Sequence, residues 1–350
     1  MSQAESAESE PHSAEPPGLP PVEPPSAGFI VQLFIVPAII MIVIVMVWLA
    51  FNWLAHLGED PQTYIRQLKN RDWHAAYNLA QSLHDGQHNQ QLVENEKFAQ
   101  EVSDILRAEL AEGSFEPEAV LFRRYLCRSL GFFHVDTGLP ALMEAARTDR
   151  DEREIPVRCE AIESIVQLTS NLQKSKPPKT LDQPELLAVL SDAAQDDARY
   201  TEPADDKNKL PERVWSVRER AVFALGILGT PEAAAKLGLY LDSSEPNVRY
   251  NAAVGLARHG KATDRSVEVF AEMLDPTAGL AAESTDTGKT LKRQIMLSAA
   301  IPAIGQLVES KTTTSLAPLQ APLEQLAKQS DDPEAQLKAK ALLIAIENSK

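Results

Sequence analysis

The hydrophobic positions of this chain fall into two different patterns. One uninterrupted run, from Phe29 to Ala55, contains no Asp, Glu, Lys, Arg or His. Beyond residue 60, apolar residues instead recur every three or four positions, which is the spacing of one buried face of an amphipathic helix. We find no convincing alternation of apolar and polar residues, the mark of a strand, in that part. The pattern predicts one wholly apolar helix followed by an all-helical domain.

The apolar run is long enough to cross a membrane. About 20 helical residues, rising 1.5 Å each, span a hydrocarbon core of roughly 30 Å. A buried core helix would be shorter and would carry a polar face. A cleaved signal peptide would need a basic region before a shorter apolar segment, yet the residues before Phe29 include neither Lys nor Arg. We therefore expect a permanent transmembrane helix over residues 29–55.

The flanks of this helix predict its orientation. Residues 1–28 hold seven prolines, and five glutamates are their only charged side chains. Such a tail has too little apolar surface to fold, so we expect disorder. Arg66, Lys69 and Arg71 follow the helix, and basic residues favour the cytoplasmic side. We expect the tail outside a plasma (inner) membrane and the large C-terminal domain in the cytoplasm.

The second half of the chain contains an internal repeat. Two segments match at an offset of 31 residues, with apolar residues at the first, fifth and ninth positions and a glycine at the thirteenth. The matched residues are Val217, Arg218, Ala221, Leu225 and Gly229 in one copy and Val248, Arg249, Ala252, Leu256 and Gly260 in the other. Weaker copies begin at Phe122-Arg123, Val157-Arg158 and Leu337-Lys338. The spacing predicts one apolar stripe per helix, and the glycine predicts the helix end.

These copies resemble HEAT repeats, particularly the short form also seen in the phycobilisome lyase group. The resemblance implies an all-α fold with a HEAT-like α-solenoid over residues 115–350. Taken with the apolar run, we expect this solenoid to follow one N-terminal transmembrane helix. Residues 56–114 are expected to form a helical N-terminal part of the soluble domain. Polar stretches near 170–183, 195–212 and 276–289 interrupt the pattern and are expected to be disordered loops.

A basic residue follows the first apolar position in each copy. Arg123, Arg158, Arg218, Arg249 and Lys338 occupy this place. They form either a binding ladder or a structural one; because the charge recurs with the repeat, we favour the structural interpretation. In HEAT-like repeats such a residue pairs with an acidic residue of an adjoining turn, and Asp242 and Glu245 are candidates here.

The net charge of −16 restricts the partners. A nucleic-acid backbone needs a basic face, and the sequence has no Lys/Arg stripe, so we exclude nucleic acid. Within roughly 10 Å, an acidic surface favours basic proteins and repels anionic lipid headgroups. We expect an unidentified protein partner, of which a basic one is favoured, and contact with the bilayer only through residues 29–55.

The sequence offers no convincing catalytic, metal or cofactor site. No histidine precedes a glutamate, and no HExxH motif is present. Gly288-Lys289-Thr290 ends like a phosphate-binding loop but lacks the earlier glycine and the preceding strand. Cys127 is expected to pack in the core, and Cys159 to be partly exposed. We therefore expect no cofactor, no metal and no enzyme.

Three hypotheses follow for the function. The first is a membrane-anchored scaffold or adaptor whose repeats bind protein partners. The second is a HEAT-like enzyme or lyase-type chaperone acting on a small ligand. The third is a structural protein that assembles with copies of itself.

Overall fold

The chain divides into two compact units, Met1–Gly58 and Glu59–Lys350. The computed structural model describes residues 26–56, 60–84, 89–204, 213–280, 285–330 and 332–348. The expected disordered tail lies outside these residues, apart from its last three positions.

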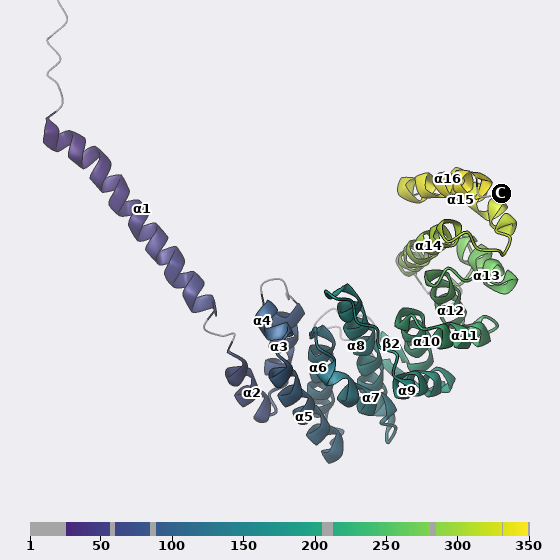
Figure 1. Ribbon diagram of the computed structural model, residues 1–350, viewed down its shortest axis with the longest axis horizontal. Coiled ribbons are helices and arrows are strands. Elements are labelled where there is room, and N and C mark those ends of the chain that lie inside the picture. Colours follow the sequence, from purple (N-terminus) through teal and green to yellow (C-terminus); the bar gives the residue numbers. More distant parts are fainter. Residues whose placement is uncertain are drawn as a thin grey trace, which may run out of the picture. The chain divides into compact units, whose positions relative to one another are not determined.

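The first unit contains one helix, α1 (Ala27–His56) (Figure 1). Val31–Phe51 within it is long and apolar enough to span a membrane, and none of it is buried. Pro37 is accommodated inside the helix, as transmembrane helices allow. The apolar residues surround the helix and leave no polar face for water. An N-terminal helix that could span a membrane is thus present, as its composition predicted.

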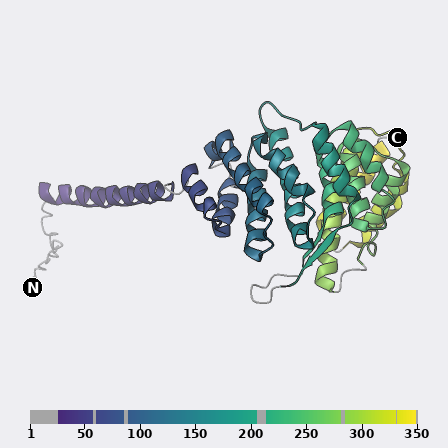
Figure 2. The ribbon, with the colours of Figure 1, turned by 90° about the horizontal axis from the view of Figure 1, so that it is seen from below.

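The second unit is built from helices in two rows, with successive helices side by side (Figures 1 and 2). The first row consists of α3 (Trp73–His84), α6 (Pro117–Phe132), α8 (Ile155–Lys174), α10 (Val217–Leu228), α12 (Pro246–Arg258), α14 (Asp286–Glu309) and α16 (Pro333–Asn348). The second row consists of α5 (Glu96–Glu112), α7 (Leu139–Arg147), α9 (Pro184–Gln195), α11 (Pro231–Leu237), α13 (Asp264–Leu274) and α15 (Gln320–Gln329). Each first-row helix packs on the next, and the chain alternates between rows. The predicted all-α repeat architecture is confirmed.

Two short helices complete the N-terminal end of this unit. They are α2 (Pro61–Lys69), which packs on α3 and α5, and α4 (Gln90–Val93). The 3-10 helices η1 (Asp136–Gly138), η2 (Glu152–Glu154), η3 (Gly238–Tyr240) and η4 (Ala317–Leu319) lie in connections. Residues 60–84 and 89–114 share one continuous apolar core with the repeats, so this part is not a separate folding unit.

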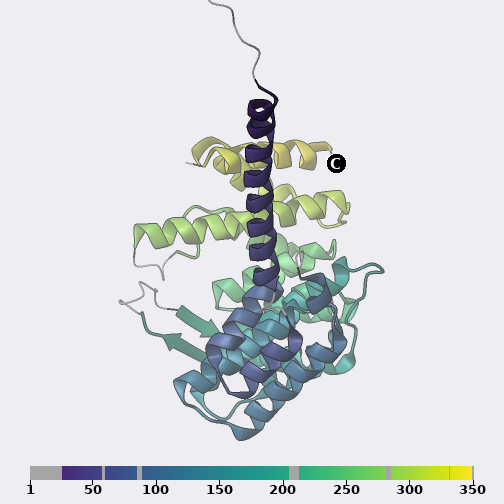
Figure 3. The ribbon, with the colours of Figure 1, turned by 90° about the vertical axis from the view of Figure 1, so that its left-hand side faces the viewer.

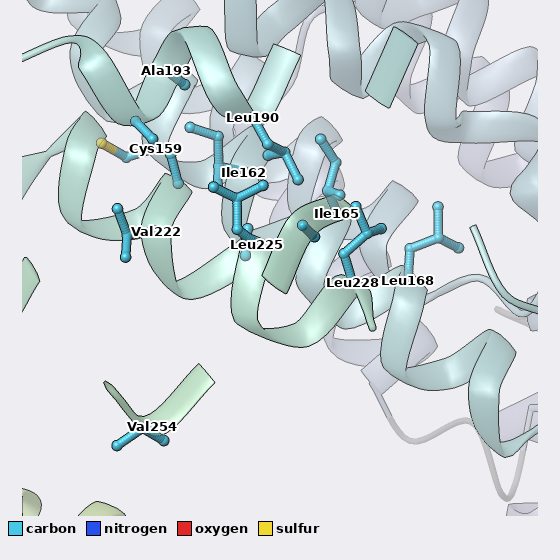
Figure 4. Close-up of a cluster of buried hydrophobic side chains, with 14 of the residues drawn as sticks. Cys159, Ile162, Ile165, Leu168, Leu190, Ala193, Val222, Leu225, Leu228 and Val254 are labelled. Carbon is cyan, nitrogen blue, oxygen red and sulfur yellow. The ribbon is translucent and has the colours of Figure 1, made fainter. Parts of the chain in front are cut away.

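The core lies between the two rows. Val217, Ala221 and Leu225, the stripe of one repeat copy, are fully buried. Figure 4 shows how side chains of α8, α9 and α10, among them Ile162, Leu190 and Leu225, gather in the space between these helices. A helix pair cannot bury both of its apolar faces alone, so the stacking of neighbours completes the core.

Local residues set several helix ends, and at Gly229 the end is the one that the repeat predicted. The Asp60 side chain accepts a hydrogen bond from the backbone N–H of Gln62, and Pro61 opens α2. Pro231 opens α11 behind the Thr230 cap. Gly229 ends α10 at φ +83°, a conformation that favours glycine.

The expectation of no strand beyond residue 60 was wrong. β1 (Arg199–Glu202) and β2 (Arg213–Ser216) form an antiparallel hairpin beside the helices (Figure 3). Four residues per strand are too few for alternation to be detected, and the pairing itself is a tertiary contact. The hairpin occupies part of the expected loop at 195–212, of which residues 205–212 lie outside the described part.

The other two expected loops are shorter than predicted. Helix α8 continues to Lys174, because Leu172 is buried and extends its apolar stripe. Helix α14 begins at Asp286, where the Thr285 side chain caps it. The polar composition of these stretches concealed both helix ends.

Candidate binding surface

The recurring arginines point at the ends of second-row helices. Arg123, Arg158, Arg218 and Arg249 each donate a hydrogen bond to a backbone carbonyl in the last turn of the preceding second-row helix or in the connection that follows it. The acceptors are Glu109 for Arg123, Ala146 for Arg158, Gln195 for Arg218 and Ser243 for Arg249, at 3.5, 3.3, 2.9 and 3.2 Å. The last carbonyls of a helix have no intrahelical partner and carry partial negative charge. A guanidinium satisfies both needs at once.

The same arginines reach a carboxylate farther along the chain. Arg123 lies 3.7 Å from Glu154, Arg158 lies 2.5 Å from Asp196, Arg218 lies 3.0 Å from Glu245, and Arg249 lies 2.9 Å from Glu272. Each arginine therefore ties one helix pair to the turn or helix that follows. This geometry supports the structural interpretation of Arg218 and its pairing with Glu245. Asp242, the other candidate, pairs with Arg265 instead, at 2.7 Å.

The repeat pattern in the sequence misses one arginine of this series, and it includes one lysine that does not make the same contacts. Arg293 on α14 donates to the carbonyls of Met273 and Asp275, both at 2.7 Å. It was missed because Lys292 stands where the repeat has an apolar residue. Lys338 pairs with Glu334 of its own helix at 2.6 Å.

Both cysteines are enclosed by apolar packing. Cys127 is fully buried, as expected. Cys159 is fully buried too, which corrects the expectation of partial exposure: it lies with the side chains of α8, α9 and α10 in the core (Figure 4). Burial raises the pKa of the Cys159 thiol to about 12 and that of Cys127 still further above its usual range. Neither thiol is poised to react at neutral pH.

The described residues contain no group of three or more His, Cys, Asp and Glu side chains placed to hold a metal ion. His84, at the end of α3, is exposed and its ring meets that of Phe132 edge-on at 4.9 Å. Gly288-Lys289-Thr290 lies in the first turns of α14, where Thr285 caps the backbone N–H of Gly288. This segment is therefore part of the N-terminal end of α14.

The first row carries a charged cluster around one tryptophan, which we call the Trp215 cluster. Its members are Trp215, the four arginines Arg124, Arg128, Arg213 and Arg220, and the three glutamates Glu160, Glu163 and Glu202. The Trp215 ring is fully buried. Guanidinium carbons of Arg213, Arg124 and Arg220 lie 3.7, 4.6 and 5.4 Å from its centroid, within the range of cation–π attraction.

The carboxylates of the cluster hold most of its cations. Arg128 donates two hydrogen bonds to Glu160, at 2.8 and 2.7 Å. Arg220 donates to Glu163 at 2.9 Å. Glu202 accepts from the Trp215 indole N–H at 3.0 Å and from Arg124 at 3.4 Å. These contacts join α6, α8, α10 and the hairpin into one fixed polar surface.

Burial of the cluster affects its acids. Burial raises the pKa of Glu163, and the nearby charge of Glu160 raises it further, although Arg220 and Arg213 oppose this. Glu163 thus depends on Arg220 and Arg213 to stay ionised.

The same row continues past the cluster to a small cleft between α12 and α14. Its volume is about 220 Å³, and its walls combine polar Asn247 and Asn251 with apolar Val254 and Ile295. Ile295 is 57% exposed at the edge of this cleft. The row therefore offers charged, amide and apolar contacts in sequence.

Residues 209–285 match the family model for HEAT repeats, and no curated protein matches the sequence. The structure of the complex of CpcE and CpcF of phycocyanin lyase from Nostoc sp. PCC7120 is similar at 17% identity and a TM-score of 0.41, covering 82% of this chain and 94% of that chain. The structure of human deoxyhypusine hydroxylase in complex with glycerol is similar at 16% identity and a TM-score of 0.26, covering 78% and 98%.

The similar structures correct the expectation that this chain is not an enzyme. The sequence led us to expect no enzyme, but both of these similar structures are of enzymes, a lyase and a hydroxylase. That expectation is therefore withdrawn, because a helical repeat domain of this kind does not argue against catalysis. What the repeat pattern, the two rows of helices and the family model agree on is the fold: this chain carries HEAT repeats within an all-helical, solenoid-like domain.

Proposed function

We propose that the chain is a membrane-anchored HEAT-repeat scaffold that binds a protein partner along its first row of helices. The observation that carries the proposal is the first-row surface, where the Trp215 cluster and the cleft beside Ile295 present fixed charged and apolar groups. Side chains that are already ordered lose little entropy on binding, which favours a specific partner. Anchoring through α1 confines this surface to the membrane plane and raises its effective concentration for partners there.

The proposed location is a plasma (inner) membrane with the repeats in the cytoplasm. Three basic residues after α1, and none before it, support this orientation. Protease added outside intact spheroplasts should cleave the tail and spare the repeats, as judged by fragment mass. Cleavage of the repeats instead would reverse the orientation.

The net charge of −16 supports a partner whose overall surface is basic. Long-range attraction of this kind acts on the rate of encounter and weakens as salt is added. The specific contacts of the first row then decide which basic protein stays bound.

A matched pair of substitutions tests the surface. Ile295 on the first row is 57% exposed, and Leu239 in η3, which follows the second-row helix α11, is 72% exposed, so a charge at either site should leave the fold intact. Affinity capture of the detergent-solubilised full chain should recover one protein in stoichiometric amount. Ile295→Glu should lose it, and Leu239→Glu should retain it.

Two results would reject the proposal. Equal recovery of the partner by both variants would show that the first row is not the binding surface. Recovery of further copies of the chain alone would favour self-assembly, the third hypothesis from the sequence.

A further inference from the structure

The Trp215 cluster contains one more cation than anion. Among the described residues of the cluster, four arginines face three glutamates. The carboxylate of Glu160, whose side chain is 4% exposed, accepts two hydrogen bonds from Arg128. Glu202 accepts hydrogen bonds from both Trp215 and Arg124, and Glu163 accepts one from Arg220. The excess positive charge therefore belongs to the remaining arginine, Arg213.

Among the described residues, no acceptor lies within hydrogen-bond distance of the Arg213 guanidinium group. Its nearest carboxylate among the described residues is Glu163, at 3.9 Å, which is too far for a hydrogen bond. Its side chain is 43% exposed. Its guanidinium carbon lies 3.7 Å from the centroid of the Trp215 ring, so the ring supports the group and leaves N–H donors accessible to solvent.

The groups around Arg213 destabilise its positive charge. Burial lowers the pKa of Arg213, and the charges of Arg124 and Arg220 lower it further, while Glu163 and Glu160 oppose the change. The Nε of Arg124 is also buried without a hydrogen-bond partner in the described part of the chain. An additional carboxylate at this point would relieve the repulsion among three neighbouring guanidinium groups.

We infer that Arg213, supported by Trp215, is the contact point for an acidic side chain of the protein partner. This inference rests on the proposed scaffold function and adds the chemistry of one contact to it. A planar guanidinium with two parallel donors matches a carboxylate better than an ammonium does. Membrane headgroups and nucleic acids are disfavoured occupants, because a chain of net charge −16 repels extended polyanions.

This local preference is compatible with a partner that is basic overall. The net charge acts over a distance comparable to the Debye length, about 8 Å in physiological salt. The Arg213 contact forms at hydrogen-bond range, where the local charge of the cluster dominates. The partner is therefore expected to place one Glu or Asp within a mainly basic surface.

A defined acidic peptide tests the inference without the partner. A capped peptide with one glutamate between alanines is titrated calorimetrically into the full chain in neutral detergent, where we expect one site with a Kd of about 1 mM. Arg213→Gln should weaken binding about tenfold, because the charged donor is lost. Arg213→Lys keeps the charge but not the planar fork, and should weaken binding about threefold.

Arg265→Gln is the matched control. Arg265 is 42% exposed and is paired with Asp242 and Glu268, outside the cluster, so peptide binding should not change. Arg213→Gln binding the peptide as well as the original chain would overturn the inference, as would absence of binding by the original chain. The scaffold proposal is tested separately by partner capture with the Ile295 variant, so either can fail alone.

Discussion

At the scale of single residues, the repeat depends on arginines placed where lysine would not serve. A guanidinium has five donors in a plane, so one side chain reaches both a carbonyl at a helix end and a carboxylate in the next turn. Arg123 is the extreme case, since it is 0% exposed and faces Glu154 at 1%. Burial lowers the pKa of Arg123, and the charge of Glu154 opposes that effect. Such a pair links α6 to η2 at a considerable cost in desolvation.

Replacing this buried arginine separates packing from charge. Arg123→Ala should lower the free energy of unfolding by about 3 kcal/mol or more, because it leaves a cavity in place of a fully buried side chain. Arg123→Met fills the volume and should cost less, since Glu154 keeps its bonds from Arg150. Urea unfolding followed by circular dichroism measures both.

Lys338→Ala provides the comparison at a position that is 53% exposed. Its pair with Glu334 lies on one exposed helix, so the loss should be below about 0.5 kcal/mol. A loss for Arg123→Met as large as for Arg123→Ala would show that charge, not packing, dominates at this site.

At the scale of helices, the contact of α10 with α12 depends on two glycines. A Cβ added at Gly226 would lie 2.8 Å from the Cα of Gly255, and one added at Gly255 would lie 2.9 Å from the Cα of Gly226. Both neighbours are backbone atoms, which cannot rotate away. The two helices therefore approach more closely than any pair of side chains would allow, in the part of the chain where the repeat is clearest.

Alanine at this crossing is expected to destabilise the domain despite its higher helix propensity. Gly226→Ala should lower the free energy of unfolding by about 1–3 kcal/mol, the usual effect of overpacking a core. A lowered midpoint in urea or thermal unfolding would record the change.

Gly305 on α14 is the control, because an added Cβ there meets only Leu342 at an ordinary 3.7 Å. Gly305→Ala should stabilise by about 0.5–1 kcal/mol through helix propensity. Stabilisation by Gly226→Ala as well would show that α10 and α12 separate without cost.

At the scale of the whole molecule, two units of opposite character lie on one chain. The first contains an apolar helix of which no part is buried in the described structure. The second buries its apolar residues in one continuous core from Tyr64 to Ile346. In a stack of this kind each helix pair is stabilised by its neighbours, so the domain should not require the apolar helix for folding.

Removing residues 1–58 tests this independence. The full chain should remain in alkaline-washed membranes, because its apolar helix resists transfer to water. Residues 59–350 should be recovered in the aqueous fraction with helical circular dichroism. A full chain released by the wash would argue against anchoring, and an insoluble fragment would argue against an independent repeat domain.

The sequence by itself determined the apolar helix, the helical repeat and the end of α10, because these depend on local periodicity and on residues such as Gly229. It also indicated the arginine series, since that recurs with the repeat, but it missed Arg293, whose neighbour Lys292 breaks the apolar pattern. Only the tertiary structure decided the rest. The hairpin, the burial of Cys159 and the Trp215 cluster join residues up to 91 positions apart, from Arg124 to Trp215. Such contacts depend on which helices become neighbours, and the periodicity of a single helix carries no information about its neighbours.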